Sequence, residues 1–154
     1  MEHEIAEALV RRAMTQASIA AARGDAPFGA VLATPDGRVL LEAANAQATT
    51  GDPTAHAEIA LIRDAARELG RPTLDGLVIA SNAESCSMCA SALVKARVTT
   101  IAFGAPSEGH MDPAIRLAEL VARSRHKPLL VGPVLADECA AQIRAARDAT
   151  PAPD

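Results

Sequence analysis

The chain has 154 residues, with 15 Lys and Arg against 19 Asp and Glu, and a formal net charge of −4. This length fits one domain of ordinary size, and an apolar fraction of 49% excludes an intrinsically disordered chain. The 2 Phe are its only aromatic residues, so Ala, Val, Ile and Leu must build the core. The acidic balance and the scarcity of aromatic side chains argue against a surface that binds nucleic acid.

A segment that would direct the chain to or through a membrane is not predicted. No uncharged apolar run reaches the roughly 18 residues that a membrane-spanning helix needs, and the N-terminus lacks the basic and apolar regions of a secretory signal. The chain has 3 Cys, and an odd number of cysteines does not indicate a disulfide framework. We therefore expect a cytoplasmic protein without membrane contact, in which clustered Cys indicate metal binding or catalysis.

Hydrophobic periodicity and turn residues predict alternating helices and strands. In chain order, we expect a helix over 4–22, strands over 28–33 and 38–43, a helix over 52–69, a strand over 77–81, a helix over 86–96, a strand over 98–103, a helix from 112, a strand over 128–131 and a helix over 135–146. The turn Thr-Pro-Asp-Gly at 34–37 makes the first two strands an antiparallel hairpin. Asp52-Pro53 and Asp112-Pro113 indicate helix starts, because Asp caps free N–H groups and Pro suits the first helical position.

Strands that alternate with helices after one hairpin are typical of a mixed sheet covered on both faces. The sequence therefore predicts an α/β fold, a three-layer α/β/α sandwich with a central mixed five-stranded sheet. We expect a single domain over 1–147 and a flexible C-terminal tail over 148–154, which ends in Thr-Pro-Ala-Pro-Asp.

Two short motifs carry the metal-ligating residue types. His56 and Glu58 lie in the first turn of one predicted helix, and Cys86 and Cys89 lie in the first turn of the next. Thiols three residues apart share a helix face, and a helix N-terminus favours their thiolate form. Two thiolates and one imidazole are three good ligands for Zn²⁺ and leave a fourth position for water. Glu58 is then placed to move the proton of that water without binding the metal.

Together with further stretches, these motifs resemble the cytidine-deaminase-like zinc deaminases, and among them the branch of cytosine, guanine and tRNA-adenosine deaminases. The matching stretches appear in family order and spacing across residues 24–105: 26–32, Asn45, 52–58, Glu84, 86–89 and 103–105. The expected order of helices and strands is also that of the family fold. The resemblance implies a zinc enzyme that replaces an exocyclic amino group with oxygen and releases ammonia.

The resemblance also implies roles for individual residues. The metal ligands would be His56, Cys86 and Cys89, the proton shuttle Glu58, and the substrate-binding groups the Asn45 amide, the Ala57 N–H and Phe28. The chain departs from the family at Ser85 and Ser87, where proline is usual, and at Ala80, where an aromatic residue is usual. Because Pro presets the backbone, this loop should be less rigid or be held by serine hydrogen bonds.

Several of these residues also have an ordinary structural interpretation. Asn45 suits a turn or strand end, Phe28 suits the core, and Glu84 could hold a loop as well as contact substrate. His110 and Asp112 could contact ring substituents, but Asp112 equally suits a helix cap. Cys139 is expected to be a small buried apolar residue, and it is not assigned to the zinc site.

From the sequence we expect a zinc-dependent deaminase of a small free nucleobase or analogue. Cytosine, isocytosine, azacytosine and aminotriazine are ranked slightly above guanine, because few aromatic residues are available to hold a large ring system. The alternatives are guanine deaminase proper, then a tRNA adenosine deaminase, which the acidic charge disfavours, and then a non-catalytic zinc-binding regulatory domain. The resemblance further implies a homodimer.

Overall fold

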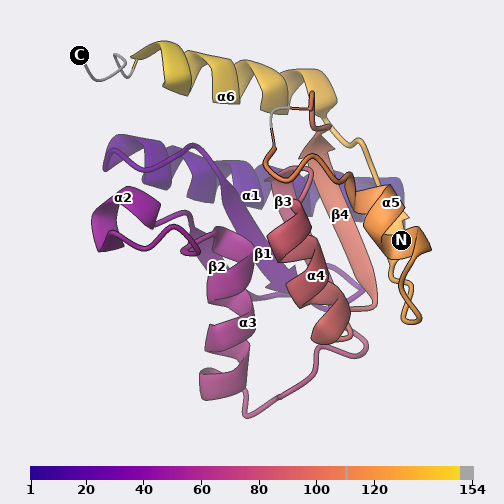
Figure 1. The fold of residues 1–154 in the computed structure, drawn as a ribbon. Helices are drawn as coiled ribbons and strands as arrows, with labels where there is room; N and C mark the ends of the chain where they lie inside the picture. The colour runs from indigo at the N-terminus through magenta and orange to yellow at the C-terminus, as the bar shows by residue number, and fades with distance from the viewer. Residues whose placement is uncertain (110, 150–154) are drawn as a thin grey trace.

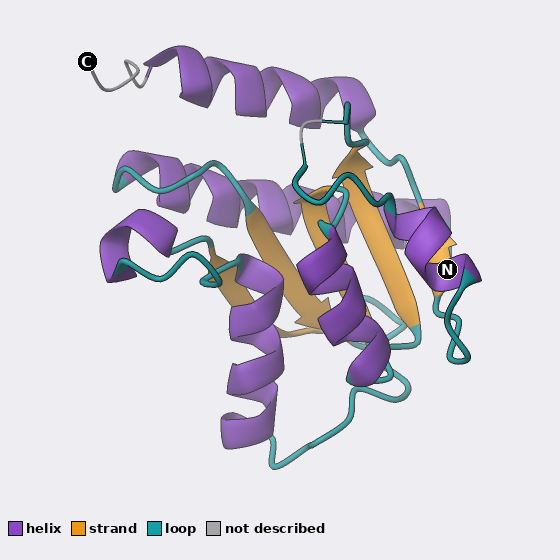
Figure 2. Ribbon diagram, in the orientation of Figure 1, coloured by secondary structure: helices purple, strands orange, loops and turns teal. Residues whose placement is uncertain are grey.

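The computed structural model describes residues 1–109 and 111–149. A five-stranded sheet in the order β2-β1-β3-β4-β5 carries helices on both faces (Figures 1 and 2). The elements are α1 (His3–Ala22), β1 (Gly29–Ala33), β2 (Val39–Ala44), α2 (Gln47–Thr50), α3 (Ala57–Glu68), β3 (Val78–Ala83), α4 (Ser87–Lys95), β4 (Thr100–Ala105), α5 (Leu117–Ala122), β5 (Leu129–Val131) and α6 (Ala136–Ala149). No described helix combines the length and the apolar character that crossing a membrane requires.

The sheet is mixed, as predicted. β1 pairs antiparallel with β2 and with β3, whereas β3, β4 and β5 run parallel to one another. The predicted hairpin connects β1 and β2, and its turn is closed by the Gly37 N–H, which donates to the Thr34 carbonyl at 2.9 Å. Gly37 has a φ of +91°, a conformation that residues with a Cβ rarely adopt.

Alternating side chains of the strands build two apolar layers. In β1, Ala30 and Leu32 belong to the core beneath α3, α4 and α5, whereas Val31 and Ala33 belong to the core beneath α1 and α6. Alternate residues of one strand belong to different layers because successive side chains point to opposite faces of the sheet. Both layers are buried. Figure 1 shows α1 and α6 on one side of the sheet and α3 and α4 on the other. The predicted three-layer α/β/α sandwich is therefore confirmed.

Two glycines allow helices to approach the sheet closely. A Cβ on Gly29 would lie 2.4 Å from the Ala13 carbonyl oxygen of α1. A Cβ on Gly104 of β4 would lie 2.4 Å from the Sγ of Cys139, on α6. Cys139 is fully buried against β4, in agreement with its expected role as a small apolar residue.

The helix predicted from Asp52 begins five residues later, at Ala57, and His56 is its N-cap. The Asp52 carboxylate accepts hydrogen bonds from the N–H and the hydroxyl of Thr54, both at 2.8 Å. It therefore stabilises a local turn and not the helix. The short helix α2 before that turn was not predicted.

The predicted helix start at Asp112 is also wrong, because α5 begins at Leu117 with Arg116 as its N-cap. Asp112 is consequently not a helix cap. At the other end of the chain, α6 continues to Ala149, so residues 148 and 149 are helical and do not belong to a tail. The remainder of the expected tail, 150–154, lies outside the described residues.

Candidate active site

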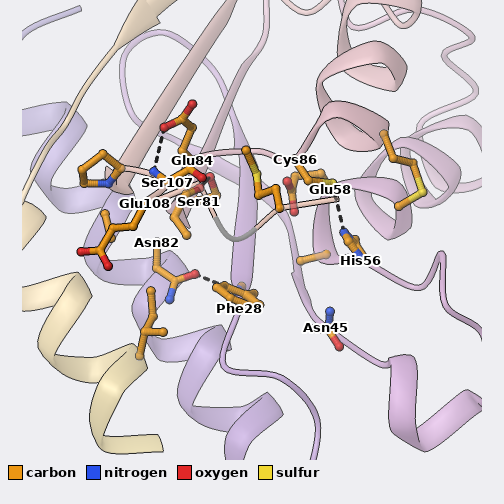
Figure 3. A pocket seen from close by; sticks show the side chains of 18 of the residues that line it. Phe28, Asn45, His56, Glu58, Ser81, Asn82, Glu84, Cys86, Ser107 and Glu108 are labelled. Carbon is orange, nitrogen blue, oxygen red and sulfur yellow. Dashed lines mark hydrogen bonds between the residues drawn. The ribbon is translucent and has the colours of Figure 1, made fainter. Parts of the chain in front are cut away.

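The three predicted metal ligands converge where α3 and α4 begin. His56 caps α3 and Cys86 caps α4, while Cys89 lies in the first turn of α4. The His56 Nδ1 lies 3.5 Å from the Cys86 Sγ and 3.4 Å from the Cys89 Sγ. All three ligand atoms lie within 4.8 Å of one another. Figure 3 shows His56, Glu58 and Cys86 gathered at one end of a pocket.

The donor set fits a zinc ion. Tetrahedral zinc with Zn–N and Zn–S bonds of about 2.1 and 2.3 Å separates its N and S ligands by about 3.6 Å. The two N···S distances of 3.5 and 3.4 Å match that separation. No further His, Cys, Asp or Glu within residues 1–109 and 111–149 joins this group. Three protein ligands leave one position open, which is the arrangement of a catalytic zinc site and not of a structural one.

Each thiol of the pair changes the acidity of the other. The hydrogen bond with Cys89 lowers the pKa of Cys86 to about 4, and contact with His56 lowers it as well, although burial opposes both. The pKa of the Cys89 thiol is raised, first by its hydrogen bond to Cys86 and then by its burial. The pair thus supplies a thiolate, the form that binds metal, as soon as one proton leaves.

Glu58 is the second residue of α3 and lies next to the three predicted metal ligands without being one of them. Its carboxyl is buried at 7% exposure, and that burial raises its pKa, as does the charge of Cys86. A raised pKa makes this carboxylate a better proton acceptor, which suits the predicted shuttle role.

The ligands form one end of a cavity of about 550 Å³. Its wall is built from the start of β1, the ends of β3 and β4, the N-terminal turns of α3 and α4, the loop after β4, and α6. The lining includes Phe28, Asn45, Ala57, Glu58, Ser81, Asn82, Glu108, Met111, Asp112, Ile143, Arg144 and Arg147. Every predicted site residue among the described ones therefore lines or borders this cavity except Cys89, which lies behind it. His110 lies outside the described residues.

The position of Asn45 is compatible with both of the roles considered for it. Asn45 lines the cavity, yet its amide also accepts from the Gln47 N–H at 3.1 Å and donates to the Gln47 side chain at 2.8 Å. Its backbone is fixed by Arg23, which donates to the Asn45 carbonyl at 2.8 Å and to Asp25 at 2.6 Å. The Asn45 side chain is thus held in place by its own loop before any ligand binds.

The Ala57 N–H is available to a ligand. Ala57 is the first residue of α3, is buried at 1% exposure and lines the cavity. Its N–H is one of the helix N-terminal donors that have no acceptor within the helix, and no acceptor for it occurs in the described part of the chain. Phe28 packs partly against the core beneath α1 and α6 while also lining the cavity.

Glu84 holds a loop. Its carboxylate accepts from the Ser107 N–H at 2.8 Å, from the Leu117 N–H at 3.1 Å and from the Arg116 guanidinium at 2.7 and 2.9 Å. Burial raises the pKa of this carboxyl, but these hydrogen bonds outweigh burial and lower it overall. Glu84 thereby fixes both ends of the loop that brings Glu108 and Asp112 to the cavity.

The two serines that replace the usual prolines differ in their surroundings. Ser87 lines the cavity, whereas Ser85 is buried at 1% exposure. The Ser85 Oγ is the one buried side-chain polar atom of the described residues without a hydrogen bond of full geometry. It lies close enough to the Glu58 carboxyl to act against the rise in pKa of that group, so Ser85 links this loop to α3 through Glu58.

The lining residues that were not predicted from the sequence include Ser81, Asn82, Arg144 and Arg147. Asn82 is fully buried, accepts from the Gly29 N–H at 3.0 Å and donates to Gln142 of α6 at 3.3 Å, so it connects β3 with β1 and α6. Arg144 lies in the helix predicted over 135–146, whereas Arg147 follows its predicted end by one residue and is helical in the structure. Nothing in the local pattern of this helix indicates which of its faces meets the cavity.

A zinc-type site with an adjacent buried glutamate, on a mixed sheet between two helical layers, defines a class of hydrolytic zinc enzymes. The family model for the cytidine and deoxycytidylate deaminase zinc-binding region matches residues 3–105. The chain belongs to this deaminase family, and it is a zinc-dependent aminohydrolase by that membership.

Its relatives include tRNA-specific adenosine deaminases, a guanine deaminase and tRNA(Ile)-lysidine synthases. The chain is 40% identical over 106 residues to the tRNA-specific adenosine deaminase of Agrobacterium fabrum, an alignment that covers 68% of this chain and 69% of that protein. It is 38% identical over 109 residues to the guanine deaminase of Bacillus subtilis, covering 70% and 67%. A solved structure of a tRNA:A34 deaminase superposes with a TM-score of 0.79 at 32% identity and covers 87% of this chain and 97% of that one.

Proposed function

We propose that this enzyme deaminates a purine in a small molecule, replacing the exocyclic amino group by oxygen. The main support for this proposal is the cavity of about 550 Å³ that opens from the predicted zinc ligands and Glu58. A volume of this size lies within the range of pockets for drug-sized ligands, about 300–1,000 Å³, and leaves ample room around a one-ring base. The relatives that are named as deaminases act on purines, guanine and the adenosine of tRNA, which also favours two rings over one.

The residues at the ligand end have distinct roles in this reaction. When bound, zinc supplies a water molecule activated for attack on the ring carbon that carries the amino group. Glu58 takes a proton from the water and delivers protons to the ring nitrogen and to the departing amine, so that a C–O bond replaces the C–N bond and ammonia leaves. The Ala57 N–H and the Asn45 amide orient the ring through hydrogen bonds.

Deamination of adenosine within tRNA is the second candidate, and the identity to tRNA-specific adenosine deaminases specifically favours it. The charge of the chain opposes it. RNA binding draws most of its affinity from cations that neutralise phosphates, and this chain carries a formal charge of −4.

A panel of amines tests both candidates and the non-catalytic alternative. We expect ammonia release from at least one purine base, nucleoside or nucleotide, and little from cytosine, isocytosine or an aminotriazine. Glu58→Ala should remove the signal on every substrate that responds. Inosine formation in tRNA without any release from small purines would overturn the proposal in favour of the second candidate. A panel without any response from intact zinc-loaded protein would support a non-catalytic zinc domain.

We also propose that the protein forms a homodimer and is located in the cytoplasm. Both proposals come from the sequence and its resemblance to the family. Sedimentation equilibrium of the zinc-loaded protein measures the oligomeric state directly, and a monomer at micromolar concentration would contradict the dimer.

A further inference from the structure

The end of the cavity that is remote from the zinc ligands is formed by one face of α6. Ala140, Ile143, Arg144 and Arg147 all line the cavity. Their spacing of three, four and seven positions is that of a single helix face. The apolar members pack toward the sheet, since Ile143 is buried, while both arginines are exposed. The face therefore presents two guanidinium groups, about one helical turn apart, to the same space as the zinc ligands.

Neither of these guanidinium groups is neutralised by a carboxylate of the described residues. Elsewhere in the fold, Arg11 pairs with Glu138 and Arg116 pairs with Glu84. Neither Arg144 nor Arg147 forms an ion pair within residues 1–109 and 111–149. Arg147 instead lies over the ring of Phe28, with its guanidinium carbon 5.8 Å from the ring centroid. That contact leaves the N–H groups at the edge of the guanidinium plane free to bind an anion.

The opposite wall has different chemistry. The loop after β4 brings Glu108 and Asp112 to the cavity, and Glu108 has interactions of its own. The remaining carboxylate of that wall, Glu84, is neutralised by Arg116. The cavity thus has cationic donors on α6 and carboxylate acceptors on the facing loop. A ligand that fits both walls carries an anionic group and, separately, hydroxyl or amino donors.

We propose that Arg144 and Arg147 bind a phosphate of the substrate, so that the enzyme acts on a purine nucleoside monophosphate. This inference rests on the proposed function, because it assumes that the purine ring lies at the zinc ligands. Guanidinium groups match phosphate oxygens in geometry and charge. A ribose between ring and phosphate carries hydroxyl donors for the carboxylates of the loop, and the cavity has room beyond the ring for both groups.

The phosphate belongs to a small nucleotide and not to an RNA strand. The helix that carries the two arginines also carries Asp137, Glu138 and Asp148. Its formal charge is therefore negative overall, and a polyanion along it would meet carboxylates beyond the cavity. A single phosphate at the α6 end of the cavity meets the two guanidinium groups, whereas the carboxylates of the cavity belong to other elements of its wall.

Calorimetric binding to zinc-loaded Glu58→Ala protein tests the inference without turnover. The ligands are guanine, guanosine and guanosine 5′-monophosphate, and the matching adenine series. We expect one monophosphate to bind about tenfold or more tighter than its nucleoside, the gain of one good charge-assisted contact. Adding Arg144→Ala and Arg147→Ala should remove that gain and leave nucleoside binding unchanged. The double change Arg63→Ala and Arg125→Ala, which removes the same charge at exposed sites outside the cavity, should preserve it.

The remaining outcomes separate the two proposals. Equal binding of base, nucleoside and monophosphate, within about twofold, overturns the phosphate site but leaves purine deamination intact. The absence of binding and of ammonia release with every purine overturns the proposed function itself. A tRNA anticodon stem-loop that binds tighter than the monophosphate and loses affinity in the Arg144/Arg147 variant overturns the assignment to a small nucleotide. Thermal unfolding of each variant verifies that the two surface changes leave the fold intact.

Discussion

Glu58 combines two properties that few other acidic residues of this chain share: burial and contact with the metal ligands. Burial raises the pKa of its carboxyl, and the charges of Cys86 and His56 act on that carboxyl directly, so a metal held by these residues would lie beside it. We predict that Glu58→Gln lowers kcat by about 10²–10⁴-fold, the usual contribution of a proton-transferring side chain. Zinc content, measured by atomic absorption, should remain at the wild-type level.

The control for this change is Glu68→Gln, at the exposed end of the same helix. It removes an identical carboxylate without altering the site and should leave kcat unchanged. If Glu58→Gln kept more than a third of the wild-type kcat, Glu58 would not be the proton shuttle.

Ser85 carries the one buried hydroxyl of the described residues that lacks a hydrogen bond of full geometry, and its one interaction is with the Glu58 carboxyl. A buried hydroxyl without a well-formed bond has lost its hydrogen bonds to water, and that loss costs about 1–3 kcal/mol. We therefore predict that Ser85→Ala raises the free energy of unfolding of the zinc-loaded protein by about 1 kcal/mol, as measured by urea denaturation.

Ser87→Ala provides the comparison, because Ser87 lines the cavity and its hydroxyl can reach solvent. It should change the free energy of unfolding by less than about 0.5 kcal/mol. A decrease in stability for Ser85→Ala would show that the hydroxyl makes a stabilising hydrogen bond, to Glu58 or to a bound water.

Prediction from sequence succeeded for residues whose function depends on local motifs. His56, Cys86 and Cys89 meet as their spacing indicates. It failed for Arg144 and Arg147, because only the packing of α6 against the sheet determines which of its faces lines the cavity. A helix of mostly Ala, Arg and acidic residues has no pronounced apolar face that would indicate this orientation.

At the scale of elements, long-range hydrogen bonds decide where helices begin. The carboxylate that accepts from the first N–H of α5 belongs to Glu84, 33 residues earlier in the chain. Asp112 has the local pattern of a cap but does not have this role. Asp52 likewise stabilises a turn through Thr54. Local capping patterns predict that a helix is near, whereas tertiary contacts fix its first residue.

Asp25 shows how one buried carboxylate joins elements around the site. It accepts from the N–H and hydroxyl of Thr49 in α2, at 2.8 and 2.6 Å, and from Arg23 at the end of α1. Burial raises the pKa of this carboxyl, but the hydrogen bonds from Thr49 and Arg23 outweigh burial and lower it overall. Ionised Asp25 therefore stabilises the segment that carries Asn45.

We predict that Asp25→Asn lowers the free energy of unfolding at pH 7 by about 1–3 kcal/mol. Because the pKa is lower in the folded state, the stabilisation is fully present above the unfolded value of about 3.9 and is lost as the pH falls through the folded value. Urea denaturation of both proteins between pH 7 and about pH 3.5 should show their difference constant down to about pH 5 and shrinking below it. A difference that grew toward acid would contradict the assignment.

At the scale of the whole molecule, a bound metal would join the first turns of two helices that share one apolar core. His56 is the N-cap of α3, and Cys86, 30 residues later, is the N-cap of α4. The sheet positions both helices by their apolar faces, but the first turns meet at the ligand atoms. A ligand that binds only the folded state adds its binding free energy to stability.

We predict that removing zinc by chelation lowers the Tm by about 10 °C. Zinc present at 1,000 times its Kd adds about 4 kcal/mol, and each kcal/mol moves the Tm of a chain of this size by roughly 2–4 °C. Differential scanning calorimetry measures the shift, and added zinc should reverse it.

Cys139→Ala removes a buried thiol outside the site and should retain the full response to chelation. Cys89→Ser removes one of the three metal ligands and should abolish the response to chelation, so that the metal-free and the zinc-treated variant unfold at the same Tm. A wild-type Tm that changed with neither chelator nor added zinc would show that His56, Cys86 and Cys89 do not hold a stabilising metal.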